Sequence, residues 1–366
     1  GIMGFERQVL LNGLTAILGT IRGLGAVLVI WLIAPTITVF FSWQIFASFL
    51  QVGLTAFFFW KIIPAGARTA RINIKSLQSI WRFTAGMGAT GLVTFCLSQL
   101  DKVVLSKLLS LSMFGYYNVS NQVNTAIRMS SNSIFAAFLP RMSSLFASED
   151  EKALRIIYHK GCQFVSFIVL PASAVIAFFS YDLIYLWTQN KEVAYMAAPI
   201  ASVLVVGSAF NSLMGIPYHM TVARGWAMFG FYQNLIAAII MVPIMILLSK
   251  HFGGIGAASA WLILNIGYLI VSMPIIIRRV IPGELRSWYM VDVGRPFLLS
   301  FGLIGLGWYF VPGDGALWLK LLMIIMLWIF AQLFCVFALP YIRQQATQIL
   351  RYRKGSGYGF GIEKKQ

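Results

Sequence analysis

One apolar stretch of the chain has the residues whose types and spacing are best suited to binding a ligand. They follow one another at intervals of four, three, four and three residues, as Tyr117, Asn121, Asn124, Arg128 and Ser131. These intervals place all five on one face of a helix, while the opposite face is mostly apolar. A guanidinium among amide and hydroxyl groups suits the recognition of phosphate oxygens, which arginine can bind in bidentate fashion.

A second arginine, Arg22, lies near the middle of another apolar stretch. A charged side chain at the centre of a membrane helix costs roughly 2.5–3.5 kcal/mol on insertion scales, so such residues tend to face water or a partner. We therefore expect Arg22 and Arg128 to line an aqueous, cationic cavity. The alternatives are that Arg22 pairs with a neighbouring carboxylate or helix carbonyls, and that the Arg128 face makes ordinary interhelical hydrogen bonds.

Two further polar residues at membrane depth are candidates. Asp101 could pair with Lys102, Arg128 or another cation, or it could be a proton or cation coupling site. Asn265 follows Trp261 by four residues and precedes Tyr268 by three. That face could stack on sugar rings and line the cavity, or it could be ordinary helix packing.

The motifs of common enzyme and cofactor sites do not occur in the sequence. There is no HExxH, phosphate-binding glycine loop, GxSxG or CxxC pattern. Cys96, Cys162 and Cys335 each lie in a separate apolar run, which favours neither a disulfide nor a metal site. We predict no cofactor, no bound metal and no enzymatic activity.

The composition indicates the elements that position these residues. Apolar residues make up 59% of the 366 residues and charged residues 11%, against about half and a quarter in soluble domains. A helix needs about 20 mostly apolar residues to cross a bilayer. Ten stretches qualify, at 9–33, 37–60, 83–105, 113–138, 161–180, 193–215, 228–248, 255–277, 294–311 and 316–338. The predicted fold is an all-α, polytopic membrane helix bundle.

The positive charges predict an orientation rather than a nucleic-acid partner. The linkers 1–8, 61–82, 139–160, 216–227, 278–293 and 339–366 hold 20 Lys and Arg residues, while the alternate linkers hold three, or four with Lys102. Such a bias marks the cytoplasmic side, so both ends of this chain are predicted to be cytoplasmic. Segments 141–160 and 278–292 mix basic, apolar and aromatic residues, which predicts interfacial helices.

Two runs of residues resemble a known family. The run Gln99–Lys107 (QLDKVVLSK), followed by Phe114–Ser120 (FGYYNVS), is similar to a signature of O-antigen repeat-unit flippases. These belong to the polysaccharide biosynthesis family, within the MATE-like multidrug/oligosaccharidyl-lipid/polysaccharide exporter superfamily. The run Phe5–Asn12 (FERQVLLN), continuing to Gly23, is similar to an inner stretch of the same family.

The resemblance implies two lobes of six helices around a central cavity, with two extra helices at the end. Residues 1–60 would be the last two helices of the first lobe and 61–82 a cytoplasmic linker. The second lobe would be 83–277, the additional helices 278–338 and the basic cytoplasmic tail 339–366. About four leading helices of the first lobe are then expected to be missing from this sequence. By the same resemblance, Arg22, Asp101 and Arg128 lie on cavity-facing helices.

The function that this resemblance implies is a flippase of the bacterial inner membrane. Its cargo would be an undecaprenyl-diphosphate-linked oligosaccharide, moved to the outer leaflet by alternating access. Its partners would be the lipid bilayer, the pathway's polymerase and its chain-length regulator. The alternatives are a cation-coupled drug or metabolite exporter of the same superfamily, and a membrane glycan polymerase or ligase.

Overall fold

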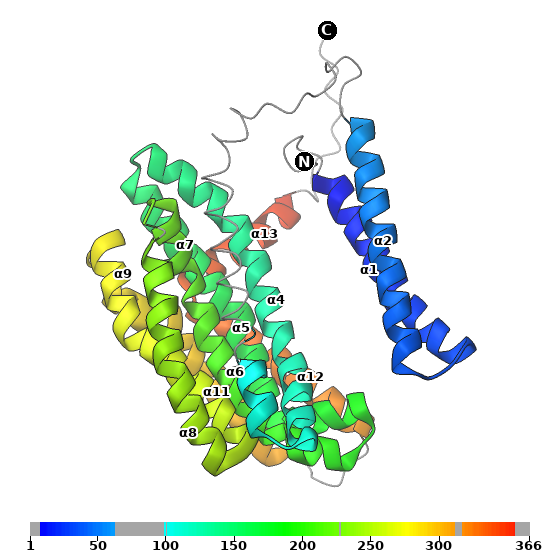
Figure 1. The fold of residues 1–366 in the computed structure, drawn as a ribbon. Coiled ribbons are helices and arrows are strands. Elements are labelled where there is room, and N and C mark those ends of the chain that lie inside the picture. Colours follow the sequence, from blue (N-terminus) through cyan, green and yellow to red (C-terminus); the bar gives the residue numbers. More distant parts are fainter. Residues whose placement is uncertain (1–7, 63–98, 100, 227, 312–316, 356–366) are drawn as a thin grey trace. The chain divides into compact units, whose positions relative to one another are not determined.

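The computed structural model describes residues 8–62, 99, 101–226, 228–311 and 317–355, apart from the side chains of 8, 9, 11, 12 and 349–355. The described residues are almost entirely helical (Figure 1). The chain divides into two compact units, Gly1–Gly88 and Ala89–Gln366, and each is described by itself.

The first unit is a helical hairpin of α1 (Gln8–Leu32) and α2 (Ile37–Ile62), which lie side by side (Figure 1). Trp43 of α2 holds the two helices together, because its Nε1 donates to the carbonyl oxygen of Arg22 at 3.0 Å. Gly25 makes this approach possible, since a Cβ there would lie 2.1 Å from the Trp43 ring. Most other apolar side chains of both helices are exposed, as expected of surfaces that face lipid.

The second unit is a bundle built around two mostly buried helices, α5 and α6 (Figure 1). Its helices are α4 (Leu111–Ala147), α5 (Glu151–Thr188), α6 (Lys191–Leu213), α7 (Gly215–Ala223), α8 (Met228–Gly267), α9 (Met273–Val280), α10 (Leu285–Ser287), α11 (Arg295–Phe310), α12 (Leu317–Ala338) and α13 (Pro340–Gly355). Two π-helical segments, η2 (Tyr268–Ser272) and η3 (Trp288–Gly294), connect α8 to α9 and α10 to α11. Small residues on α6 allow its neighbours to approach closely.

Helix ends in this bundle are set by capping side chains and one glycine. Ser110, Asp150 and Asn190 accept hydrogen bonds from backbone N–H groups in the first turns of α4, α5 and α6. Gly253 interrupts α8 with a φ of +58°, a conformation that favours glycine. The sharp turn it makes separates two helical stretches within α8.

A buried polar network joins α5 to the segment that leads into α11. Asp292 is fully buried, is hydrogen-bonded to His159 Nδ1 at 2.5 Å, and accepts from Gln163 Nε2 at 2.8 Å. Glu284 contacts His159 Nε2 at 3.2 Å and accepts from Arg155 at 2.6 Å. Burial raises the pKa of Glu284, but the hydrogen bonds from Arg155 and His159 more than offset this and leave it below its usual value.

The predicted all-α membrane fold is confirmed, and seven described helices are long and apolar enough to cross a membrane. One of them, Met228–Val280, contains both the seventh and the eighth predicted span, divided at Gly253. The fourth predicted span lies in α4. This helix is not among the seven, because its polar stripe lowers its mean hydropathy. The third lies outside the described residues, except for residue 99 and the helical end from 101. The count of ten is therefore approximate.

The segments predicted to be interfacial helices, 141–160 and 278–292, do not form helices of their own. Instead, α4 continues through Pro140 to Ala147, and α5 begins at Glu151. Residues 278–292 are divided among the end of α9, the short α10 and η3. Proline can be accommodated inside a membrane helix when neighbouring groups satisfy the freed carbonyl, so Pro140 did not end α4.

Candidate functional site

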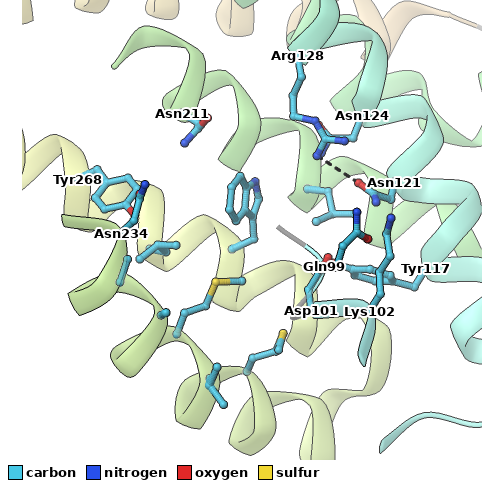
Figure 2. Close-up of a pocket in the computed structure, with 18 residues that line it drawn as sticks. Gln99, Asp101, Lys102, Tyr117, Asn121, Asn124, Arg128, Asn211, Asn234 and Tyr268 are labelled. Carbon is cyan, nitrogen blue, oxygen red and sulfur yellow. Dashed lines mark hydrogen bonds between the residues drawn. The ribbon is translucent and has the colours of Figure 1, made fainter. Parts of the chain in front are cut away.

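The second unit contains a cavity of about 530 Å³, within the usual range for ligand pockets. Its walls come from Gln99, Asp101 and Lys102 and from α4, α6, α8 and η2 (Figure 2). The lining residues are Gln99, Asp101, Lys102, Tyr117, Asn121, Asn124, Arg128, Leu204, Asn211, Asn234, Ala237, Ala238, Met241, Val242, Met245, Trp261, Leu264 and Tyr268.

Four residues of the predicted stripe on α4 line this cavity. Arg128 donates through Nη1 to Asn121 Oδ1 at 3.5 Å (Figure 2), and through Nη2 to Thr125 Oγ1 at 3.0 Å. None of the ion pairs among the described residues involves Arg128. The guanidinium therefore keeps its positive charge available to a ligand. Ser131, at the end of the stripe, instead donates to Ser212 Oγ of α6 at 2.8 Å, an interhelical bond.

Tyr117 and Asp101 form a hydrogen-bonded pair on the same side of the cavity. Tyr117 is 3% exposed, and its hydroxyl donates to Asp101 Oδ2 at 3.3 Å. The other oxygen of this carboxylate, Oδ1, is buried without a hydrogen-bond partner among the described residues. Lys102 also lines the cavity, but it makes no ion pair with Asp101 in the described part of the chain.

The opposite wall has residues that no sequence pattern pointed to. Asn211 of α6, Asn234 of α8 and Tyr268 of η2 lie across the cavity from Arg128 (Figure 2). Asn211 stands beside Ser212 and Asn234 beside Gln233. Adjacent polar residues do not indicate which side of a helix faces a cavity, so the sequence did not single these two out. Trp261 and Tyr268 had a helical spacing, but their position at a cavity required the fold.

Asn265 and Arg22 differ from the other candidates in where the structure places them. Asn265 is fully buried and is not among the residues that line the cavity. It accepts from Asn211 Nδ2 and donates to the carbonyl oxygen of Trp261, both at 2.8 Å, so it supports two lining residues. Arg22 belongs to the first unit, where its Nη2 donates to Ser48 Oγ at 2.7 Å.

The cavity combines two cations and one carboxylate with neutral amides and aromatic rings. Such a site can attract an anion and can also hydrogen-bond to hydroxyl groups and stack on flat apolar faces. Within the described part of the chain, no three His, Cys, Asp or Glu residues are grouped as metal ligands would be. The groups that line this cavity are suited to binding a ligand.

The fold defines a class of helical membrane protein. It is similar to that of a solved structure, the lipid II flippase MurJ in an inward closed conformation, with a TM-score of 0.59. The match covers 81% of this chain and 61% of that chain, at 14% sequence identity. At this identity the likeness concerns the fold.

Comparisons of sequence point to particular relatives within that class. Residues 44–191 match the model of a polysaccharide biosynthesis protein family. The chain is 23% identical over 259 residues to the lipopolysaccharide biosynthesis protein WzxC of Escherichia coli K12. It is 22% identical over 249 residues to a putative O-antigen transporter of Shigella flexneri. The predicted resemblance to flippases of surface polysaccharide units is confirmed.

The matched regions differ in how much of each protein they cover. They include 69% and 66% of this chain, but only 50% and 56% of the two relatives. The chain thus spans about half the length of the curated relatives that it matches.

Proposed function

We propose that this chain is part of a flippase that moves an undecaprenyl-diphosphate-linked oligosaccharide from the inner to the outer leaflet. The cargo is an O-antigen or similar surface polysaccharide repeat unit. Movement occurs by alternating access, in which two helical lobes rock about a central cavity. The named relatives and the flippase fold support this proposal.

The single observation that carries the proposal is the state of Arg128. Its guanidinium lines a cavity within a set of apolar helices, and within the described part of the chain it donates hydrogen bonds to the neutral side chains of Thr125 and Asn121. An uncompensated cation at such a site attracts an anionic group, and a diphosphate offers several oxygens in the geometry that arginine prefers. Lys102 adds a second positive charge to the cavity lining.

The proposal also assigns roles to other residues and segments besides Arg128. Asp101 is the candidate for coupling to a proton or cation gradient, because one of its oxygens is unpartnered beside the cavity. Arg22 is a further candidate for binding the anionic cargo. Residues 83–277 form the second lobe and 278–338 the additional helices. The protein resides in the bacterial inner membrane with both ends of this chain cytoplasmic, and works with the pathway's polymerase and chain-length regulator.

The other two functions fit the cavity less well. A cation-coupled exporter of cationic drugs is expected to have an excess of buried carboxylates, whereas this cavity has two cations and one carboxylate. A glycan polymerase or ligase needs catalytic groups on a sizeable outer segment. The predicted outer loops between the spans are only about a dozen residues at most.

Complementation of a translocase-deficient bacterial strain by the full-length protein tests the proposal. Loss of a flippase leaves the complete lipid-linked repeat unit on the inner leaflet, whereas loss of a polymerase leaves single units attached outside. Restored surface polysaccharide, with the inner-leaflet intermediate returned to its normal amount, is the expected result. An intermediate that stays on the inner leaflet at normal expression of the protein contradicts the proposal.

A further inference from the structure

The two walls of the cavity differ in chemistry. The wall that includes α4 has all three charged side chains that line the cavity, Asp101, Lys102 and Arg128. The wall from α6, α8 and η2 has amides, aromatic rings and aliphatic side chains, with no charged residue among those that line it. Figure 2 shows Asn211, Asn234 and Tyr268 on one side and the charged residues on the other.

Trp261 is fixed on the neutral wall by two contacts with α6. Its Nε1 donates to Ser208 Oγ at 3.0 Å. Its ring edge lies close to the backbone of Gly207, where a Cβ would be only 2.7 Å from Trp261 Cδ1. Because its one N–H donor is already paired within the protein, this indole offers the cavity its apolar surface rather than a hydrogen bond.

The groups beside Trp261 are also held in place. Asn211 gives one N–H to the buried Asn265, which in turn donates to the Trp261 carbonyl oxygen. This bond fixes the orientation of the Asn211 amide, and it uses the amide nitrogen rather than the amide oxygen. Tyr268 is the first residue of the π-helical segment η2. Such a widened turn is rare and is often found at functional sites.

Two acceptor atoms on the charged side of the cavity have no hydrogen-bond partner among the described residues. Asn124 lines the cavity and is 2% exposed, and its Oδ1 has no hydrogen-bond partner among the described residues. The same is true of Asp101 Oδ1. A buried acceptor without a donor is costly. A diphosphate lacks the donors that these oxygens need, whereas the hydroxyl and amide groups of a sugar supply them.

We propose that Trp261, Asn211 and Tyr268, with Asn124 opposite, form a carbohydrate subsite. It takes the pyranose ring next to the diphosphate of the cargo, while Arg128 and Lys102 take the phosphates. One apolar face of the ring stacks on Trp261, because its polarised C–H groups are attracted to the negative face of the indole. Asn211 and Asn124 bind the hydroxyl or amide groups at the rim of the ring. This subsite rests on the proposed function and extends it to sugar recognition.

Binding of two lipids that differ only in the sugar tests the subsite. The full-length protein in lipid nanodiscs is titrated with undecaprenyl diphosphate and with undecaprenyl diphosphate N-acetylglucosamine. We expect the parent protein to bind the glycosylated lipid about tenfold more tightly, the size of one good stacking contact. Trp261→Leu loses that preference but keeps its affinity for the bare lipid, and Trp261→Phe retains most of it.

Two control variants separate stacking from charge and from folding. Trp318→Leu, at an exposed site on α12, keeps the preference. Arg128→Ala weakens binding of both lipids by the same factor. Equal affinity of the parent protein for the two lipids, or equal weakening of both by Trp261→Leu, overturns the subsite and leaves the flippase proposal standing. Failure of the parent protein to bind either lipid overturns both.

Discussion

Replacement of Arg128 by alanine is expected to weaken binding of a lipid diphosphate and to slow its flipping. A guanidinium has five N–H donors, and two of them are used within the protein, by Thr125 and Asn121. The remaining donors are available to the cargo. A hydrogen bond to a charged group contributes about 1.5–3 kcal/mol. Because Arg128 is partly exposed, we count one such contribution rather than several.

That free energy corresponds to roughly a 10- to 150-fold weaker affinity for undecaprenyl diphosphate in Arg128→Ala. Arg128→Lys keeps the charge but loses the planar fork of donors, so it falls between the parent and the alanine variant. Binding is measured by titration in nanodiscs, and flipping by the appearance of a labelled lipid in the outer leaflet of proteoliposomes. Arg141→Ala, at an exposed position on the same helix, is the matched control. An Arg128→Ala protein that binds and flips like the Arg141→Ala protein refutes the reasoning.

Three further predictions concern carboxylates. Asp101→Asn should abolish the response of flipping to an imposed proton or sodium gradient while the protein still binds undecaprenyl diphosphate, and a normal response in proteoliposomes contradicts coupling through Asp101. Asp292→Ala should cost about 3–5 kcal/mol of stability, because it leaves the buried side chains of His159 and Gln163 without their fully buried partner. Glu151→Ala, at a residue whose side chain is 71% exposed, should cost about 0–1 kcal/mol, and equal thermal midpoints would argue against the network. The pKa of Glu284 is lowered below its usual 4.5, so its pairing with Arg155 stabilises the fold at neutral pH and is lost as the pH falls below about 4.5. Thermal unfolding at pH 7 and pH 3.5 should show a smaller pH effect in Glu284→Gln, and an unchanged pH effect would exclude this pair as its source.

The sequence was sufficient to predict the membrane fold and one wall of the cavity. Long apolar stretches predict helices because lipid permits few other structures. The spacing of Tyr117, Asn121, Asn124 and Arg128 predicted a common face, because helical periodicity is local. The cavity lining agrees with that prediction for all four residues.

The rest of the site depends on contacts between distant parts of the chain. Asn211 and Asn234 each have an adjacent polar neighbour, Ser212 and Gln233, so no helical spacing indicated which of them lines the cavity. The pairing of His159 with Asp292 joins residues 133 positions apart. The π-helical turn that begins at Tyr268 is a local widening of the helix. Sequence periodicity does not predict such a turn.

Accessibility of the α4 stripe to a charged reagent tests most directly whether a water-filled cavity binds an anionic lipid. Asn121→Cys and, as a lipid-facing control on α12, Ile325→Cys are made in a full-length protein whose native cysteines are replaced by serine. Each is treated in proteoliposomes with a membrane-impermeant thiol reagent. We predict that Cys at position 121 is labelled, that undecaprenyl diphosphate protects it, and that Cys at position 325 stays unlabelled. An unlabelled position 121, or labelling that the lipid does not reduce, would contradict a cargo held at Arg128.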